Sequence, residues 1–169
     1  MTADSTPAGR PYVAVVGPAE VSDTGLRNIA FEVGRLLASG GAVVVTGGLG
    51  GVMAAAAEGA TSAGGLSIGL LPGTERPNES SHTYLLTTGL GELRNGLVVR
   101  SCHGLIAVGG SWGTLSEIAL AMRLEIPVIS IAGWRLHDEA NRELPVDRAA
   151  TASEGVARLL NRLRAVGST

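Results

Sequence analysis

The chain contains no lysine, because all 13 of its basic residues are arginine. This absence excludes pyridoxal phosphate enzymes, which hold their cofactor as a lysine Schiff base. It also excludes P-loop nucleoside triphosphatases, whose Walker A loop ends in Gly-Lys-Ser/Thr. The single cysteine, Cys102, excludes an intrachain disulfide and a zinc site made of several cysteines. We predict that Cys102 is a small buried side chain and that the chain is cytoplasmic, since so little cysteine is typical of a reducing compartment.

Strong charge of one sign and long hydrophobic runs are also missing. The net charge is −2 with no basic block, so we expect neither nucleic acid nor a membrane surface as a partner. No apolar run approaches the roughly 20 residues of a membrane span, and residues 1–10 lack the apolar core of a signal peptide. We predict a disordered tail over residues 1–10 and one domain over residues 11–169.

From residue 12 onward, short apolar runs alternate with amphipathic stretches of helical length, which is typical of βαβ units around a parallel sheet. The expected strands are residues 12–17, 42–46, 66–71, 84–88, 104–108 and 127–131. The expected helices are a segment that follows the capping residues Ser22 and Asp23 and residues 50–63, 90–101, 113–124 and 153–164. The sequence therefore predicts a single Rossmann-like, doubly wound α/β domain with a mainly parallel sheet, and residues 72–82 form a polar loop that could act as a lid.

Two of the expected strands end in the same way. Gly47-Gly-Leu-Gly-Gly51 and Gly109-Gly-Ser-Trp-Gly113 each follow a strand and lead into a helix. In a doubly wound sheet such turns lie at the carboxyl edge, where ligands bind at the switch in strand order. Glycine allows the backbone to approach a ligand closely, and a helix start offers unpaired N–H groups for an anion. We predict that both turns face one crevice that binds phosphate, with ordinary strand-to-helix turns as the alternative.

The dinucleotide fingerprint fits this sequence poorly. No third glycine follows Gly48 and Gly50 in register, and no acidic residue stands where a ribose would be held, so NAD and FAD are disfavoured. His82, His103 and His137 lie in separate segments without metal-ligand spacing, and we expect no metal site.

The segment after the second glycine turn carries two open interpretations. Thr114-Leu-Ser-Glu117 has the pattern of a capping box, yet a carboxylate one turn into a phosphate-binding helix also lies near the sugar of a nucleotide. Trp112 is expected either to stack on a base or to pack against a partner subunit. We assign no role to Trp134. The expected apolar face of this helix consists of Leu115, Ile118, Ala119 and Met122.

Leu93-Arg94-Asn95, followed by Ala107-Val-Gly-Gly-Ser-Trp-Gly-Thr-Leu-Ser-Glu117, resembles the paired signature of the Lonely Guy (LOG) family, which reads Arg-Lys and then Pro-Gly-Gly-x-Gly-Thr-x-x-Glu. Three departures, at Asn95, Gly109 and Ser111, resemble instead the neighbouring branch of the SLOG superfamily that includes molybdenum-cofactor carrier proteins and is distantly related to DprA. Members of the LOG family are dimeric and Rossmann-like and are often mislabelled lysine decarboxylases. The active ones release free base from nucleoside 5′-monophosphates.

The resemblance implies a function and a site. It makes Arg94 and Glu117 the catalytic candidates and implies a homodimer, for which helices 50–63 and 90–101 carry apolar side chains. The expected function is binding of a nucleotide monophosphate such as AMP, with phosphoribohydrolase activity possible and no required cofactor. The alternative is a non-catalytic carrier or sensor for a nucleotide or the molybdenum cofactor. The residues expected to bind nucleotide or phosphate are Gly17, Gly47, Gly48, Gly50, Asn95, Gly109, Gly110, Ser111, Trp112, Gly113 and Thr114.

Overall fold

The computed structural model describes residues 9–166, so the first eight residues of the predicted tail lie outside the described part. Seven strands form one sheet in the order β4-β3-β2-β1-β5-β6-β7, and every neighbouring pair is parallel. This is the Rossmann-like order, with β4 added at one edge. The strands are β1 Tyr12–Val16, β2 Val43–Thr46, β3 Ser67–Leu71, β4 Tyr84–Thr87, β5 Gly104–Val108, β6 Val128–Ile131 and β7 Asp147–Ala149.

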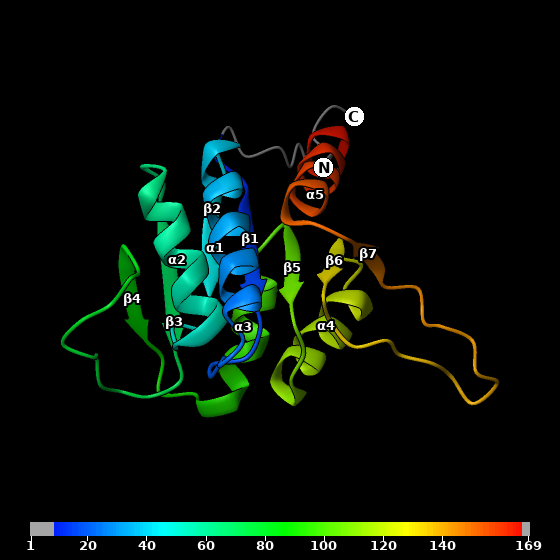
Figure 1. The fold of residues 1–169 in the computed structure, drawn as a ribbon. Helices are drawn as coiled ribbons and strands as arrows, with labels where there is room; N and C mark the ends of the chain where they lie inside the picture. The colour runs from blue at the N-terminus through cyan, green and yellow to red at the C-terminus, as the bar shows by residue number, and fades with distance from the viewer. Residues whose placement is uncertain (1–8, 167–169) are drawn as a thin grey trace, which may run out of the picture.

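Helices cover both faces of the sheet (Figure 1). Alternate residues of β1 point to opposite faces, so Val13 and Val15 belong to one apolar cluster while Ala14 and Val16 belong to the other. The first cluster is completed by α1 Thr24–Ser39, α2 Gly51–Ser62 and α5 Ala152–Val166. The second is completed by α3 Arg94–Arg100 and α4 Trp112–Arg123. The predicted fold class, a Rossmann-like α/β sheet flanked by helices, is therefore confirmed.

Two elements differ from the prediction. The helix expected over residues 90–101 is a 3₁₀ turn, Gly91–Leu93, followed by the short helix α3. Strand β7 was not predicted, because three residues are too few to show a periodic pattern and they follow the long loop 132–146. Cys102 is buried, as predicted.

The helices α1 and α2 pack so closely that glycine is required at both contacts. A Cβ atom on Gly34 would lie 1.9 Å from the Ala56 carbonyl oxygen, and one on Gly59 would lie 1.9 Å from the Phe31 carbonyl oxygen. The apolar side chains of α2 are consequently buried within the chain. Few apolar side chains of α2 are therefore left for the predicted dimer interface. Next to α3, in contrast, Leu93 is 80% exposed. The homodimer itself stays a prediction.

The described part of the chain has neither a membrane-spanning helix nor a group of side chains arranged for a metal ion. Within residues 9–166, no helix has both the length and the apolar character needed to cross a bilayer. The same residues contain no cluster of three or more histidine, cysteine, aspartate or glutamate side chains arranged to hold a metal ion.

Candidate functional site

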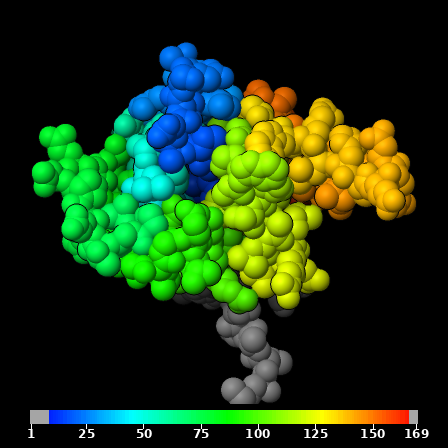
Figure 2. All heavy atoms as spheres, turned by 90° about the horizontal axis from the view of Figure 1, so that it is seen from below, coloured from blue at the N-terminus to red at the C-terminus, as the bar shows by residue number. Residues whose placement is uncertain are grey.

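The candidate site lies at the carboxyl edge of the sheet, where β1 stands between β2 and β5. A Cβ atom on Gly17, the residue after β1, would lie 2.5 Å from the Val108 carbonyl oxygen, so the ends of β1 and β5 nearly touch. Figure 2 looks onto this edge and shows the segments after β1, after β2, at the start of α3 and at the start of α4 meeting around a shallow hollow. The topology therefore gathers most of the predicted site residues at one place.

The start of α4 presents unpaired backbone donors. Ser111 caps the helix, because its side-chain oxygen accepts a hydrogen bond from the Thr114 N–H at 3.2 Å and lies 2.9 Å from the Thr114 hydroxyl. Thr114 is therefore the third helical residue, and the predicted capping box from Thr114 to Glu117 is wrong. Within the described part of the chain, no hydrogen bond uses the backbone N–H of Gly110, Ser111, Trp112 or Gly113. Such a set of donors suits an anion.

The first glycine turn is built differently from the second. The Val52 N–H at the start of α2 donates to the Pro18 carbonyl oxygen at 3.1 Å. Gly51 has φ +56, and a Cβ atom there would lie 2.4 Å from the same carbonyl oxygen. The loop after β1 thus occupies the start of α2, with Gly50 as the capping residue. At the first turn the loop after β1 takes the Val52 N–H, and the N–H groups of Leu49, Gly50 and Gly51 have no partner among the described residues. The turn before α4 differs in that, within residues 9–166, no residue of another segment occupies the start of the helix.

Glycine in these turns makes room for neighbouring groups. A Cβ atom on Gly47 would lie 2.6 Å from Nη2 of Arg94, so the missing side chain at position 47 leaves space for the guanidinium group. Gly48 and Gly109 have positive φ values of +76 and +69, which favour glycine. A Cβ atom on Gly110 would lie 2.7 Å from the indole ring of Trp134.

Arg94 and Glu117 form a buried pair. Their side chains are 8% and 7% exposed, and Nη1 of Arg94 lies 3.9 Å from Oε1 of Glu117. Nη1 of Arg94 also donates a hydrogen bond to the Asn95 side-chain oxygen, and the Asn95 amide donates to the Ser116 hydroxyl at 3.3 Å. The Ser116 hydroxyl in turn donates to the Gly113 carbonyl oxygen at 2.7 Å. The structure therefore connects the pair to the start of α4.

The charge of this pair depends on Glu117. Burial raises the pKa of Glu117 to about 7, with the nearby Arg94 guanidinium lowering it and Glu92 raising it. At pH values below about 7 the carboxyl group is mostly protonated, and the guanidinium then leaves one uncompensated positive charge next to the free donors. This favours an anionic ligand.

The buried face of α4 differs from the predicted one. Ile118 is buried as expected, but Ala119 and Met122 are exposed, and the buried positions beside Ile118 are Thr114, Glu117 and Ala121. Periodicity places apolar residues toward the core, and it failed here because Arg94 and Ser111 supply partners for two polar side chains.

Comparison with known proteins places the chain in a family. The model of the SLOG cluster4 family matches residues 10–158. The chain belongs to the SLOG cluster4 family. The molybdenum cofactor binding protein of Rippkaea orientalis is 33% identical, with 94% of this chain and 99% of that chain covered at a TM-score of 0.80.

Two further relatives also match most of this SLOG chain. The molybdenum cofactor carrier protein of Chlamydomonas reinhardtii is 31% identical, with 92% of this chain and 99% of that chain covered at a TM-score of 0.78. An uncharacterized protein of Archaeoglobus fulgidus is 40% identical over 133 residues, which are 75% of this chain and 87% of the relative. The resemblance to the carrier-like SLOG branch is thereby confirmed.

A buried histidine, for which sequence spacing gave no role, secures the loop between β3 and β4 of this SLOG domain. Nε2 of His82 lies 2.6 Å from the Thr46 hydroxyl, and Nδ1 lies 3.2 Å from the Ser80 hydroxyl. Thr46 also accepts the Gly48 N–H at 3.0 Å. We assign a neutral ring that accepts from Thr46 and donates to Ser80. The predicted lid loop is thus fastened to the first glycine turn.

This histidine is expected to make stability depend on pH. Burial lowers the pKa of His82 to about 4, whereas the unfolded chain has the ordinary value of 6.5. As the pH falls from 6.5 toward 4 the unfolded chain takes up the proton first, so the free energy of unfolding drops, by about 2–3 kcal/mol in this window. We expect urea unfolding at pH 7.5 and 4.5 to show a fall in the free energy of unfolding for the wild type that is about 2–3 kcal/mol larger than for His82→Gln. The exposed His137→Gln variant is the control, and an equal loss in all three proteins would contradict the assignment.

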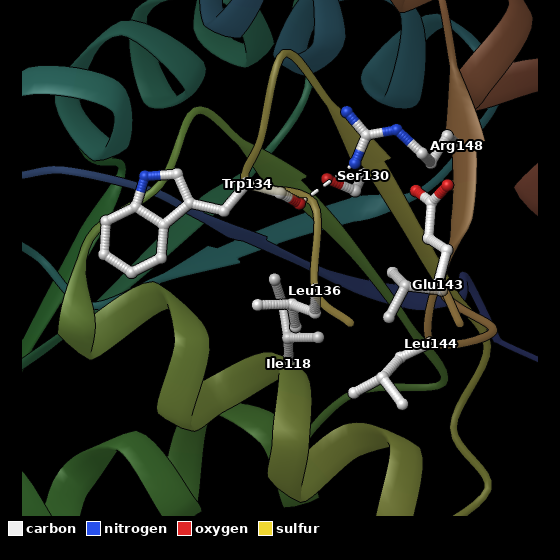
Figure 3. A pocket seen from close by; sticks show the side chains of 8 residues that line it. Ile118, Ser130, Trp134, Leu136, Glu143, Leu144 and Arg148 are labelled. Atoms are coloured by element: carbon white, nitrogen blue, oxygen red, sulfur yellow. Dashed lines mark hydrogen bonds between the residues drawn. The ribbon is translucent and has the colours of Figure 1, made fainter. Parts of the chain in front are cut away.

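A separate small cavity lies under the loop 132–146 (Figure 3). Its volume is about 10 Å³, enough for about one water molecule. Figure 3 shows Ile118, Leu136 and Leu144 facing one another there, while the indole of Trp134 points away from them. The Ser130 hydroxyl has no hydrogen-bond partner among the described residues. The cavity is too small for a nucleotide and is not the candidate site.

Proposed function

We propose that this SLOG domain binds a phosphate monoester of a planar heterocycle and holds it without chemical change, as a carrier. The observation that carries the proposal is the group of neighbouring N–H donors at Gly110–Gly113 with no partner in the described residues. A helix start with free donors favours phosphate through both hydrogen bonds and the helix dipole. Ser111 and Thr114 hold the turn in shape from within.

The names of two relatives support this choice of ligand class. One is named as a molybdenum cofactor binding protein and the other as a molybdenum cofactor carrier protein. That cofactor is a pterin with a terminal phosphate monoester, and AMP is a purine with the same terminal group. Both ligands place one anionic end and one flat ring in a site. We take the molybdenum cofactor as the better candidate cargo and AMP-like nucleotides as accessible probes of the same chemistry.

Hydrolysis of a nucleoside monophosphate is the second candidate function. It is favoured by the buried carboxyl group of Glu117, whose pKa of about 7 lets it change charge near neutral pH. Breaking an N-glycosidic bond builds positive charge on the ribose, which a carboxylate stabilises. Arg94 is no base, because its guanidinium remains protonated. Its role in either function is to orient Glu117 and attract the anion.

One incubation separates the two functions. We expect AMP, GMP, CMP and UMP to be recovered intact after prolonged incubation with the protein, as chromatography would show. Release of free base by the wild type, abolished in Glu117→Gln, would establish the hydrolase and overturn the carrier proposal. Because Glu117 is buried, the melting temperature of the variant is measured alongside, so that a folding defect is not mistaken for loss of chemistry.

A further inference from the structure

The chain places both of its tryptophans side by side. It has only five aromatic residues besides histidine, namely two tryptophans, two tyrosines and one phenylalanine. Trp112 is the first residue of α4, and Trp134 lies in the loop after β6. Their ring centroids are 5.2 Å apart and the ring planes meet at 78°, so the two indoles form a corner.

The Trp134 side of the corner is braced by distant parts of the chain. The absence of a side chain at Gly110 leaves room for the indole, since a Cβ atom there would lie 2.7 Å from it. The Arg148 guanidinium donates to the Trp134 carbonyl oxygen at 3.0 Å (Figure 3). It also donates to the Gly133 carbonyl oxygen at 3.0 Å. Arg158 of α5 donates to the Arg148 carbonyl oxygen at 2.7 Å. The corner is therefore positioned by β7 and α5 as well as by α4.

The Trp112 side of the corner is left open. Its residue is 79% exposed, and its one ring contact in the described structure is the edge-on contact with Trp134. The backbone N–H of Trp112 itself belongs to the free donors of the glycine turn. Because the same residue supplies one of these donors and an exposed indole, a phosphate on the donors and a ring on the indole would both contact Trp112. Aromatic faces bind planar rings of many kinds by stacking.

We propose that the fused ring of the ligand stacks on Trp112, with Trp134 holding that indole in place. The inference rests on the proposed phosphate site and adds a contact for the ring of the ligand. It makes the corner select purine-type or pterin-type phosphate monoesters over aliphatic ones. Trp112 is then the residue that touches the ring, and Trp134, Gly110 and Arg148 are positioning residues.

Intrinsic fluorescence provides a direct test, because both tryptophans of the protein lie in the corner. The probes are GMP and ribose 5-phosphate, which share a phosphate but differ in the fused ring. We expect GMP to quench the wild-type emission and to bind at least tenfold more tightly than ribose 5-phosphate. Trp112→Ala should weaken GMP about tenfold or more and leave ribose 5-phosphate within twofold, while Trp112→Phe keeps most of the GMP affinity.

The outcomes separate this inference from the phosphate site. Equal affinities for the two probes, or GMP affinity unchanged in a well-folded Trp112→Ala, would overturn stacking while leaving the phosphate site intact. If neither probe binds, the phosphate site and the stacking inference fall together. If Trp112→Ala leaves both affinities unchanged and lowers the molecular mass seen by light scattering, the ring contacts a second copy and the inference is wrong.

Discussion

Gly113→Asp is expected to weaken binding of GMP by at least 100-fold while the protein remains folded. Gly113 is the second residue of α4, at the centre of the free donors. A Cβ atom there would come no closer than 3.8 Å to the Ser111 hydroxyl oxygen and 4.0 Å to the Asn95 amide nitrogen, so a side chain fits. An aspartate would place a negative charge where the phosphate is proposed to lie.

The size of the effect follows from charge repulsion. Two like charges about 4 Å apart repel by about 4 kcal/mol at an effective dielectric constant near 20, and half of that is enough for a loss of about 30-fold. The aspartate also competes for the same N–H donors, which brings the expected loss above 100-fold. The stability of the fold is not expected to suffer. A carboxylate in the first turn stabilises a helix, and replacing glycine inside a helix raises the free energy of unfolding by up to about 1 kcal/mol.

Two neutral variants complete this experiment. Gly113→Asn has nearly the same shape as aspartate without its charge, and Gly113→Ala tests the effect of any side chain. Calorimetric titration should find both within tenfold of the wild type, and melting temperatures should be unchanged or raised in all three. Equal affinity of the Gly113→Asp and Gly113→Asn proteins would exclude phosphate from the start of α4.

The sequence was sufficient for six of the seven strands and for the position of the glycine turn before α4. Near-continuous apolar runs such as Leu105–Val108 mark parallel strands, and glycines that follow such runs mark the carboxyl edge. It was not sufficient to distinguish the two glycine turns. That difference depends on the Pro18 carbonyl oxygen, which accepts the Val52 N–H although the two residues lie far apart in the sequence. No local pattern reports such a contact.

The side chains around the site show the same limit. The sequence identified Arg94 and Glu117 by family resemblance, but it placed Glu117 in a capping box that the structure assigns to Ser111. Trp134 had no motif around it, because its place beside Gly110 depends on Arg148 and hence on β7, which was itself missed. Features that depend on contacts between distant residues could not be predicted from the sequence, whereas features that depend on local sequence patterns could.

The buried pair gives a physical reason to expect function here. Nε of Arg94 is buried and has no hydrogen-bond partner among the described residues. A buried donor left without a partner costs about 1–3 kcal/mol, and a buried ion pair is on balance a weak source of stability. Since Gly47 also leaves space for this guanidinium, the arrangement is poorly explained by stability alone.

The most direct measurement is calorimetric titration of the wild-type protein with matched pairs that differ only in a phosphate: AMP and adenosine, GMP and guanosine, FMN and riboflavin. Hydrogen bonds to a charged group contribute about 1.5–3 kcal/mol each, so two of the free donors on one phosphate correspond to at least 100-fold in affinity. We predict that at least one phosphorylated member binds and exceeds its partner by that factor. Equal affinity within every pair, or no binding by any phosphorylated member, would contradict the proposed phosphate site.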